Sequence, residues 1–210
     1  MNIEPKRTYA VDDLQPGQGY KLGSSLIVPR PIGWIGTRSE DGVANLAPYS
    51  YFNVVAPDPP TFVFAPVLGG RKDTLANIEA TREFTVNIVS EETVEAMNLS
   101  SGSYPADVDE FEICGLTAVA AESIGAPLVG EAVANFECVV THTIPVGRPS
   151  EDLPGTGMLV VGEATKVHVA ERLIDDNFSI DQVALQSIGR LAAMTYCRTT
   201  DALFELDRPS

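Results

Sequence analysis

The sequence has few basic residues and little histidine, cysteine or tryptophan. Fourteen lysines and arginines stand against 29 aspartates and glutamates, which gives a formal net charge of −15. Nucleic acids and anionic membrane surfaces are bound through clustered basic side chains, so neither is expected as a partner. The charge does not exclude a small anionic ligand, because a few local cations and backbone N–H groups can hold one phosphate.

Cysteine is scarce and widely spaced, at Cys114, Cys138 and Cys197. No Cys-x-x-Cys pair is present, and neither histidine stands at zinc-ligand spacing from a cysteine. We therefore expect reduced thiols and no bound metal.

Long apolar runs are also missing. No run approaches the roughly 18 residues of a membrane span. The first residues, Met-Asn-Ile-Glu-Pro-Lys-Arg, lack the apolar stretch of a signal peptide. We expect a cytoplasmic protein.

The nucleotide-loop and hydrolase signatures are absent too. Gly155-Thr-Gly157 precedes a strand rather than a helix and lacks the third glycine of a dinucleotide fingerprint.

Glycine and proline, in contrast, are plentiful, with 17 and 15 residues, which is normal for a β protein with many turns. The sequence predicts strands over five apolar or alternating segments: 26–37, 61–65, 84–89, 134–144 and 158–169. Gly162 is interpreted as a bulge in the last of them. No repeat or linker interrupts the chain, so we expect one domain over residues 1–210, with a core of 20–209.

Three segments have helical character. Residues 74–82 follow Asp73, a good N-cap residue, and residues 91–99 follow Ser90 and begin with two acidic residues. Residues 181–193 are a looser third candidate. The fold class is therefore mainly β with a few helices.

Residues 28–53 are the most informative stretch. They predict a strand, a turn at 40–42 and a second segment rich in small residues, proline and hydroxyls. Gly33 and Gly36 would let another backbone or a planar ligand come close. The side chains available for a ligand are Trp34, Thr37, Asn45 and Ser50. The alternative is a hairpin whose polar side chains satisfy their own turns.

Residues 69–77, Gly-Gly-Arg-Lys-Asp-Thr-Leu-Ala-Asn, form a second candidate site. Two cations precede a helix start, where backbone N–H groups and the helix dipole favour an anion. The alternative is a loop capped by Asp73 with solvated cations.

Both stretches resemble the flavin reductase-like, FMN-binding split-barrel family. There, a Pro-Arg-Pro-Ile-Gly-Trp strand leads to an Asn-Leu-Ala-Pro-aromatic-Ser segment that faces the flavin, which corresponds to Asn45, Leu46, Ala47, Pro48 and Ser50. A Lys/Arg-Asp-Thr-x-x-Asn motif helps to hold the FMN phosphate, which corresponds to Arg71, Lys72, Thr74 and Asn77.

A third motif departs from the family. Where the family often has Arg-Leu-Gly-Gly-x-x-Tyr, this chain places Ala192 and Ala193 between Arg190 and Tyr196. The alanines should stiffen the loop and narrow the space for a nicotinamide or second substrate. Arg190 is read either as a structural ion-pair partner or as a site residue. The two histidines, His142 and His168, are read either as hydrogen-bonded structural residues or as residues of the flavin cleft.

The resemblance implies an antiparallel, Greek-key-like split β-barrel of six or a similar number of strands. It implies a homodimer that binds FMN, rather than FAD, near the subunit interface. The implied activity is NAD(P)H:flavin oxidoreductase, with hydride transferred to flavin N5 and a monooxygenase component as one recipient of the reduced flavin. The alternatives are an FMN-containing electron carrier of the flavoredoxin type and a non-catalytic flavin-binding protein.

Overall fold

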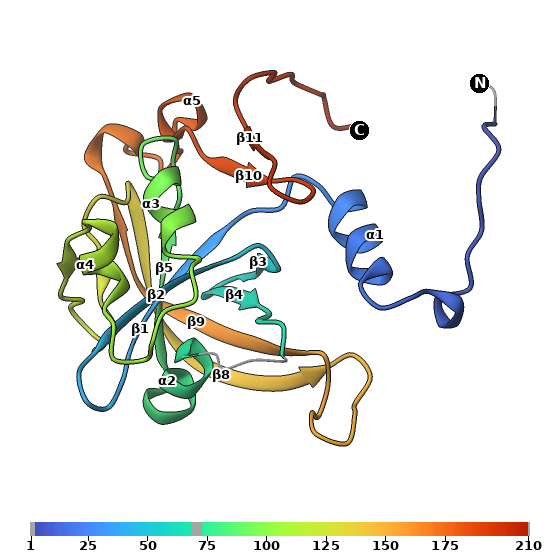
Figure 1. Ribbon diagram of the computed structural model, residues 1–210. Coiled ribbons are helices and arrows are strands. Elements are labelled where there is room, and N and C mark those ends of the chain that lie inside the picture. The colour runs from blue at the N-terminus through green and yellow to red at the C-terminus, as the bar shows by residue number, and fades with distance from the viewer. Residues whose placement is uncertain (1–2, 69–72, 210) are drawn as a thin grey trace.

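The computed structural model describes residues 3–68 and 73–209. Its centre is a seven-stranded antiparallel sheet with the strand order β2-β1-β5-β8-β9-β4-β3 (Figure 1). The strands are β1 Gly33–Arg38, β2 Ala44–Tyr49, β3 Phe52–Pro57, β4 Pro60–Phe64, β5 Glu83–Ile88, β8 Ala134–Val146 and β9 Gly157–Val169. The predicted mainly β, antiparallel class is confirmed.

The sheet is split between β2 and β3. These strands follow one another in the sequence but lie at opposite ends of the strand order, joined by Ser50 and Tyr51. Consecutive strands usually pair with each other. Here β2 pairs only with β1, and β3 pairs only with β4, so the segment 45–53 runs along two sheet edges.

Two apolar cores lie on the two sides of β1, because successive side chains of a strand point to opposite faces. Trp34 packs with Leu46 and Phe111 in one core, and Ile35 packs with Phe84 in the other. Four helices accompany the sheet: α1 Gln18–Leu26, α2 Asp73–Thr81, α3 Val94–Leu99 and α4 Glu110–Cys114. In Figure 1, α1 and the chain before it extend away from the sheet. No helix within the described ranges is long and apolar enough to span a membrane.

Smaller elements complete the fold. They are the two-stranded sheets β6 Ala118–Val119 with β7 Leu128–Val129 and β10 Ile188–Arg190 with β11 Tyr196–Arg198, the helix α5 Gln182–Leu185, and the 3-10 turns Val11–Asp13 and Glu171–Leu173. Three cysteines are free thiols.

The helix predicted over 181–193 is wrong beyond Leu185. Gln186 has a φ of 48°, in the left-handed region, which ends α5. Ser187 then forms a bridge with Ser90, and the following residues become β10. Pairing with distant segments overrides the local helical pattern.

Two other boundaries also differ. The strand predicted over 26–37 begins only at Gly33, because residues 18–26 form α1 and two prolines follow. The helix predicted over 91–99 begins at Val94, since Thr93 Oγ1 accepts the Ser90 N–H at 3.1 Å and closes a turn first.

The bulge predicted at Gly162 is also wrong. Gly162 is paired on both sides, with Phe62 and Val140, and the register shift falls on β8 between Val140 and His142. A Cβ at residue 162 would lie 2.3 Å from the Phe84 ring. Glycine is required here by the close approach of an aromatic ring.

Candidate functional site

Four residues predicted from the sequence meet in one buried hydrogen-bonded cluster. Asn45 Nδ2 donates to Thr37 Oγ1 at 3.0 Å and to Thr74 Oγ1 at 3.1 Å. Asn77 Nδ2 also donates to Thr37 Oγ1, at 3.0 Å. A fifth member, Tyr49, donates its hydroxyl to Thr74 Oγ1 at 2.9 Å. The cluster fastens the first turns of α2 to β1 and β2.

Tyr49 was not predicted. Its hydroxyl stays protonated, because burial raises its pKa to about 12, an effect that the hydrogen bond to Thr74 only partly offsets. The two-residue periodicity of a strand could have revealed Tyr49, since residues 45, 47 and 49 share one face of β2. Arg71 and Lys72, the predicted phosphate ligands just before α2, lie outside the described residues.

The cavity beside this cluster is acidic. Its volume is about 240 Å³, and its polar lining includes Asp41, Asn45, Asp73, Asn77, Asp107 and Glu110. Burial raises the pKa of the Glu110 carboxyl, although Glu110 accepts the Leu46 N–H at 3.1 Å, and the carboxylates of Asp73 and Asp109 raise it further. A phosphate would be repelled by so many carboxylates. Among the described residues, the lining of this cavity supplies no cation for an anion.

Three other predicted residues support the wall of β1 and β2. Trp34 is fully buried, and its indole N–H donates to Ser100 Oγ at 2.9 Å. Leu46 is fully buried in the same core, whereas Ala47 is half-buried. Trp34 and Leu46 therefore expose no side-chain surface to a ligand, and they shape the site from within.

Pro48 and Ser50 lie instead at a second cavity, which we call the arginine pocket. Its volume is about 210 Å³, and its lining includes Tyr20, Arg30, Pro48, Ser50, Arg190 and Tyr196. The pocket lies at the split, where β2 ends. Arg190 was a predicted site residue, whereas Arg30 was quoted only as part of the Pro-Arg-Pro motif.

Arg30 is buried and held by backbone carbonyls. It donates to the carbonyl oxygens of Ser24, Ile27 (3.1 Å) and Leu191 (3.1 Å), and its Nε donates to Ser50 Oγ at 3.4 Å. The side chain thereby ties together α1, the β2–β3 connection and the segment after β10. The charge of Arg30 faces the pocket edge at Ser50.

Arg190 lies over the Tyr196 ring, with Cζ 4.4 Å from the ring centroid. It donates to the Tyr196 hydroxyl and to the Ala193 carbonyl. Among the described residues no carboxylate forms an ion pair with it. The interpretation of Arg190 as an ion-pair partner is therefore wrong for this part of the chain.

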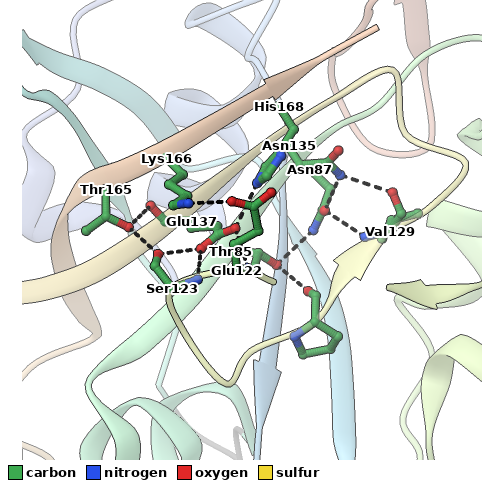
Figure 2. Close-up of polar contacts among 11 residues, drawn as sticks. Thr85, Asn87, Glu122, Ser123, Val129, Asn135, Glu137, Thr165, Lys166 and His168 are labelled. Carbon is green, nitrogen blue, oxygen red and sulfur yellow. Dashed lines mark hydrogen bonds and ion pairs between the residues drawn. The ribbon is translucent and has the colours of Figure 1, made fainter. Parts of the chain in front are cut away.

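The histidines line neither cavity. His142 is exposed on β8 and contacts only the hydroxyl of its neighbour Thr141. His168 Nε2 lies 2.8 Å from Glu137 Oε1, within a polar network that holds residues 122–129 against β5 and β8 (Figure 2). The structure thus gives His168 a structural hydrogen-bond partner.

Residues 24–196 match the family model described as "Flavin reductase like domain". The chain belongs to the flavin reductase-like family.

Solved structures agree with this family assignment. Nitrilotriacetate monooxygenase component B from Bacillus cereus is 35% identical, with a TM-score of 0.91 over 97% of this chain and 100% of that one. The 2-nitrobenzoate 2-nitroreductase of Pseudomonas fluorescens is 32% identical, with a TM-score of 0.86 over 97% of both chains. A Shewanella frigidimarina chain with a split barrel domain is 23% identical, has a TM-score of 0.79 over 94% and 96%, and supports the fold. The predicted split-barrel fold is confirmed.

The departure of this flavin reductase-like chain from its family has a structural consequence. Ala193 stands where the family often has glycine, and its φ is 49°. An alanine in the left-handed region costs about 1 kcal/mol, which glycine avoids. The carbonyl of this strained residue accepts one of the Arg190 hydrogen bonds.

Proposed function

We propose that this flavin reductase-like chain is an FMN-dependent oxidoreductase that takes electrons from NAD(P)H. The observation that carries the proposal is the family match over residues 24–196. Two solved structures above 30% identity, a monooxygenase component and a nitroreductase, support oxidoreductase chemistry.

The donors at the split fit one end of a flavin. A flavin ring carries carbonyl and ring-nitrogen acceptors, and the end of β2 at the edge of the arginine pocket offers a hydroxyl at Ser50 and an apolar edge at Pro48. The acidic cavity does not fit the phosphate. We therefore propose that the phosphate lies toward Arg71, Lys72 and the start of α2, with Thr74 as the nearest described contact.

When bound, FMN supplies an acceptor for hydride at N5, so the cofactor carries the redox chemistry. The chain's own task is positioning, which alone can supply much of a rate enhancement. In this proposal Pro48 and Ser50 set the edge of the ring. The Thr37–Asn45–Thr74–Asn77 cluster fixes α2 against β2, and therefore the distance between the ring and the phosphate end.

A homodimer completes the proposed site. Cofactor pockets usually span about 300–1,000 Å³, whereas the two cavities beside β2 in one protomer have only about 210 and 240 Å³. Tyr20, Leu26 and Ile27 at α1, and Val54 and Val55 of β3, are each more than half exposed. Apolar side chains gathered beside an open site are typical of a surface that a second subunit covers.

We further propose a domain organisation, a cellular location and a partner. We propose one flavin reductase-like domain over residues 1–210, located in the cytoplasm. A monooxygenase component is the proposed recipient of reduced flavin, by similarity to the Bacillus cereus relative.

An anaerobic titration tests the activity. The FMN-loaded protein should lose the visible absorption of its oxidised flavin when NADH or NADPH is added, and regain it in air. FMN that stays oxidised with both nucleotides would exclude nicotinamide as the reductant.

The second candidate function is an electron carrier or a flavin-binding protein without catalysis, which the Ala192–Ala193 departure favours because it narrows the space for a nicotinamide. Steady-state oxidation of NAD(P)H with excess FMN separates the two. A carrier would be reduced by dithionite or a partner protein but would show no NAD(P)H turnover.

A further inference from the structure

The arginine pocket holds two arginines as direct backbone partners. The Arg30 N–H donates to the Arg190 carbonyl at 2.9 Å, and the Arg190 N–H donates to the Arg30 carbonyl at 2.9 Å, in an isolated antiparallel bridge. Opposite residues of an antiparallel pair direct their side chains to the same face, with Cβ atoms about 5 Å apart. Both guanidinium groups accordingly line one cavity.

This arrangement is unfavourable without an anion. Like charges directly opposite each other destabilise a strand pair. The chain has 29 acidic residues, yet none of the described ones forms an ion pair with Arg30 or Arg190. Elsewhere the exposed Arg148 and Arg198 each have a carboxylate partner. The pocket therefore concentrates positive charge in an acidic protein.

The two arginines differ in their free donors. The four hydrogen bonds of Arg30 all go to protein groups, so Arg30 supplies a fixed charge. A guanidinium has five N–H donors. Arg190 uses two of them, for the Tyr196 hydroxyl and the Ala193 carbonyl. Its remaining N–H groups can bind an anion.

The other walls of the pocket are aromatic and apolar. They include Tyr20, Ile32, Met97 and Tyr196. Aromatic and apolar walls suit a flat organic body rather than a bare inorganic ion. The volume of about 210 Å³ admits a single-ring compound and not a whole dinucleotide.

We propose that the arginine pocket binds the carboxylate of a small aromatic acid. Arg190 contacts the carboxylate, Arg30 adds charge behind it, and the tyrosines enclose the ring. The inference rests on the proposed function, because it gives the chemical class of the second substrate at the flavin site.

Calorimetric titration of the FMN-saturated protein with benzoate and with benzamide tests the proposal. Benzamide has the same shape without the charge, so it should bind at least about tenfold more weakly than benzoate, the smaller end of what a charge-assisted hydrogen bond contributes. R190Q should weaken benzoate binding at least about tenfold, whereas R190K, which keeps the charge, should lose less. The control R198Q, which removes an arginine outside the pocket, should bind benzoate as the wild type does.

Four results would overturn the inference. Equal binding of benzoate and benzamide would exclude charge recognition, and equal losses in R190Q and R190K would assign Arg190 a structural role only. Inorganic phosphate that binds more tightly than benzoate, or FMN that displaces benzoate, would give the pocket to a phosphate or to the flavin itself. The proposed function is tested separately: it fails if the wild-type protein binds no FMN. In that case a benzoate titration without FMN still tests the pocket.

Discussion

Replacing Glu137 with glutamine removes the charge at the centre of a buried polar network. Glu137 is fully buried, and burial alone would raise its pKa. It accepts hydrogen bonds from the Ser123 hydroxyl, the Ser123 N–H (2.7 Å), the Glu122 N–H (2.8 Å) and His168 Nε2 (2.8 Å) (Figure 2). Together these bonds outweigh desolvation and lower the pKa from 4.5 to about 2.

The magnitude follows from that shift. At about 1.4 kcal/mol per pH unit, the ionised form of Glu137 contributes roughly 3 kcal/mol to the free energy of unfolding. Because the pKa is lower in the folded state, the contribution is complete above the unfolded pKa and is lost as the pH falls toward 2. At about pH 3 the carboxyl is protonated in the unfolded chain and ionised in the folded one, which removes about 2 kcal/mol.

Urea unfolding of wild type and E137Q at two pH values measures this contribution. The variant should be about 3 kcal/mol less stable at pH 7, and the difference should shrink to about 1 kcal/mol near pH 3. The control E163Q changes an exposed carboxylate on the same sheet and should stay within about 0.5 kcal/mol of wild type. A difference below about 1 kcal/mol at pH 7, or one that does not depend on pH, would refute the reasoning.

Two further substitutions test the packing of the site. Asn45→Ala removes one hydrogen bond from β2 to α2 and one from β2 to β1 and should lower the free energy of unfolding by about 1–3 kcal/mol, whereas the exposed Asn177→Ala should have little effect; equal urea midpoints would count against the cluster. Gly36→Ala would place a Cβ 2.6 Å from the Pro127 carbonyl oxygen and should cost at least about 2 kcal/mol. Gly23→Ala, in an open part of α1, should instead stabilise by roughly 0.5–1 kcal/mol; a thermal melt that ranks the two glycine variants the other way would contradict this.

Local sequence patterns predicted much of the fold. Strands at 61–65, 84–89, 134–144 and 158–169 appear as β4, β5, β8 and β9, since alternation and turn residues act within each segment. The same patterns failed at residues 186–193. There the bridge between Ser90 and Ser187, residues far apart in the sequence, decides the backbone conformation.

The candidate site, like the fold, was predicted from the sequence only in part. Asn45, Thr74 and Asn77 were predicted because the family motifs name them, and Thr37 because its hydroxyl lies near the turn at 40–42. The structure joins all four by hydrogen bonds. The Trp34 side chain was predicted to be available for a ligand, because residue spacing does not reveal which face of a strand is covered by other elements. Both faces of β1 are buried.

The pairing of Arg30 with Arg190 could not be predicted from either local segment. It depends on a single bridge between the two ends of the domain and on the carbonyl groups that surround Arg30.

Equilibrium titration of the purified wild-type protein with FMN, followed by visible absorption and flavin fluorescence, tests the central claim most directly. The account predicts saturable binding that quenches the flavin. Lys72→Ala, which removes the predicted phosphate contact, should weaken that binding by about 1–3 kcal/mol. A protein that is colourless and leaves FMN fluorescence unchanged at all concentrations would contradict the assignment of a flavin site to the split between β2 and β3.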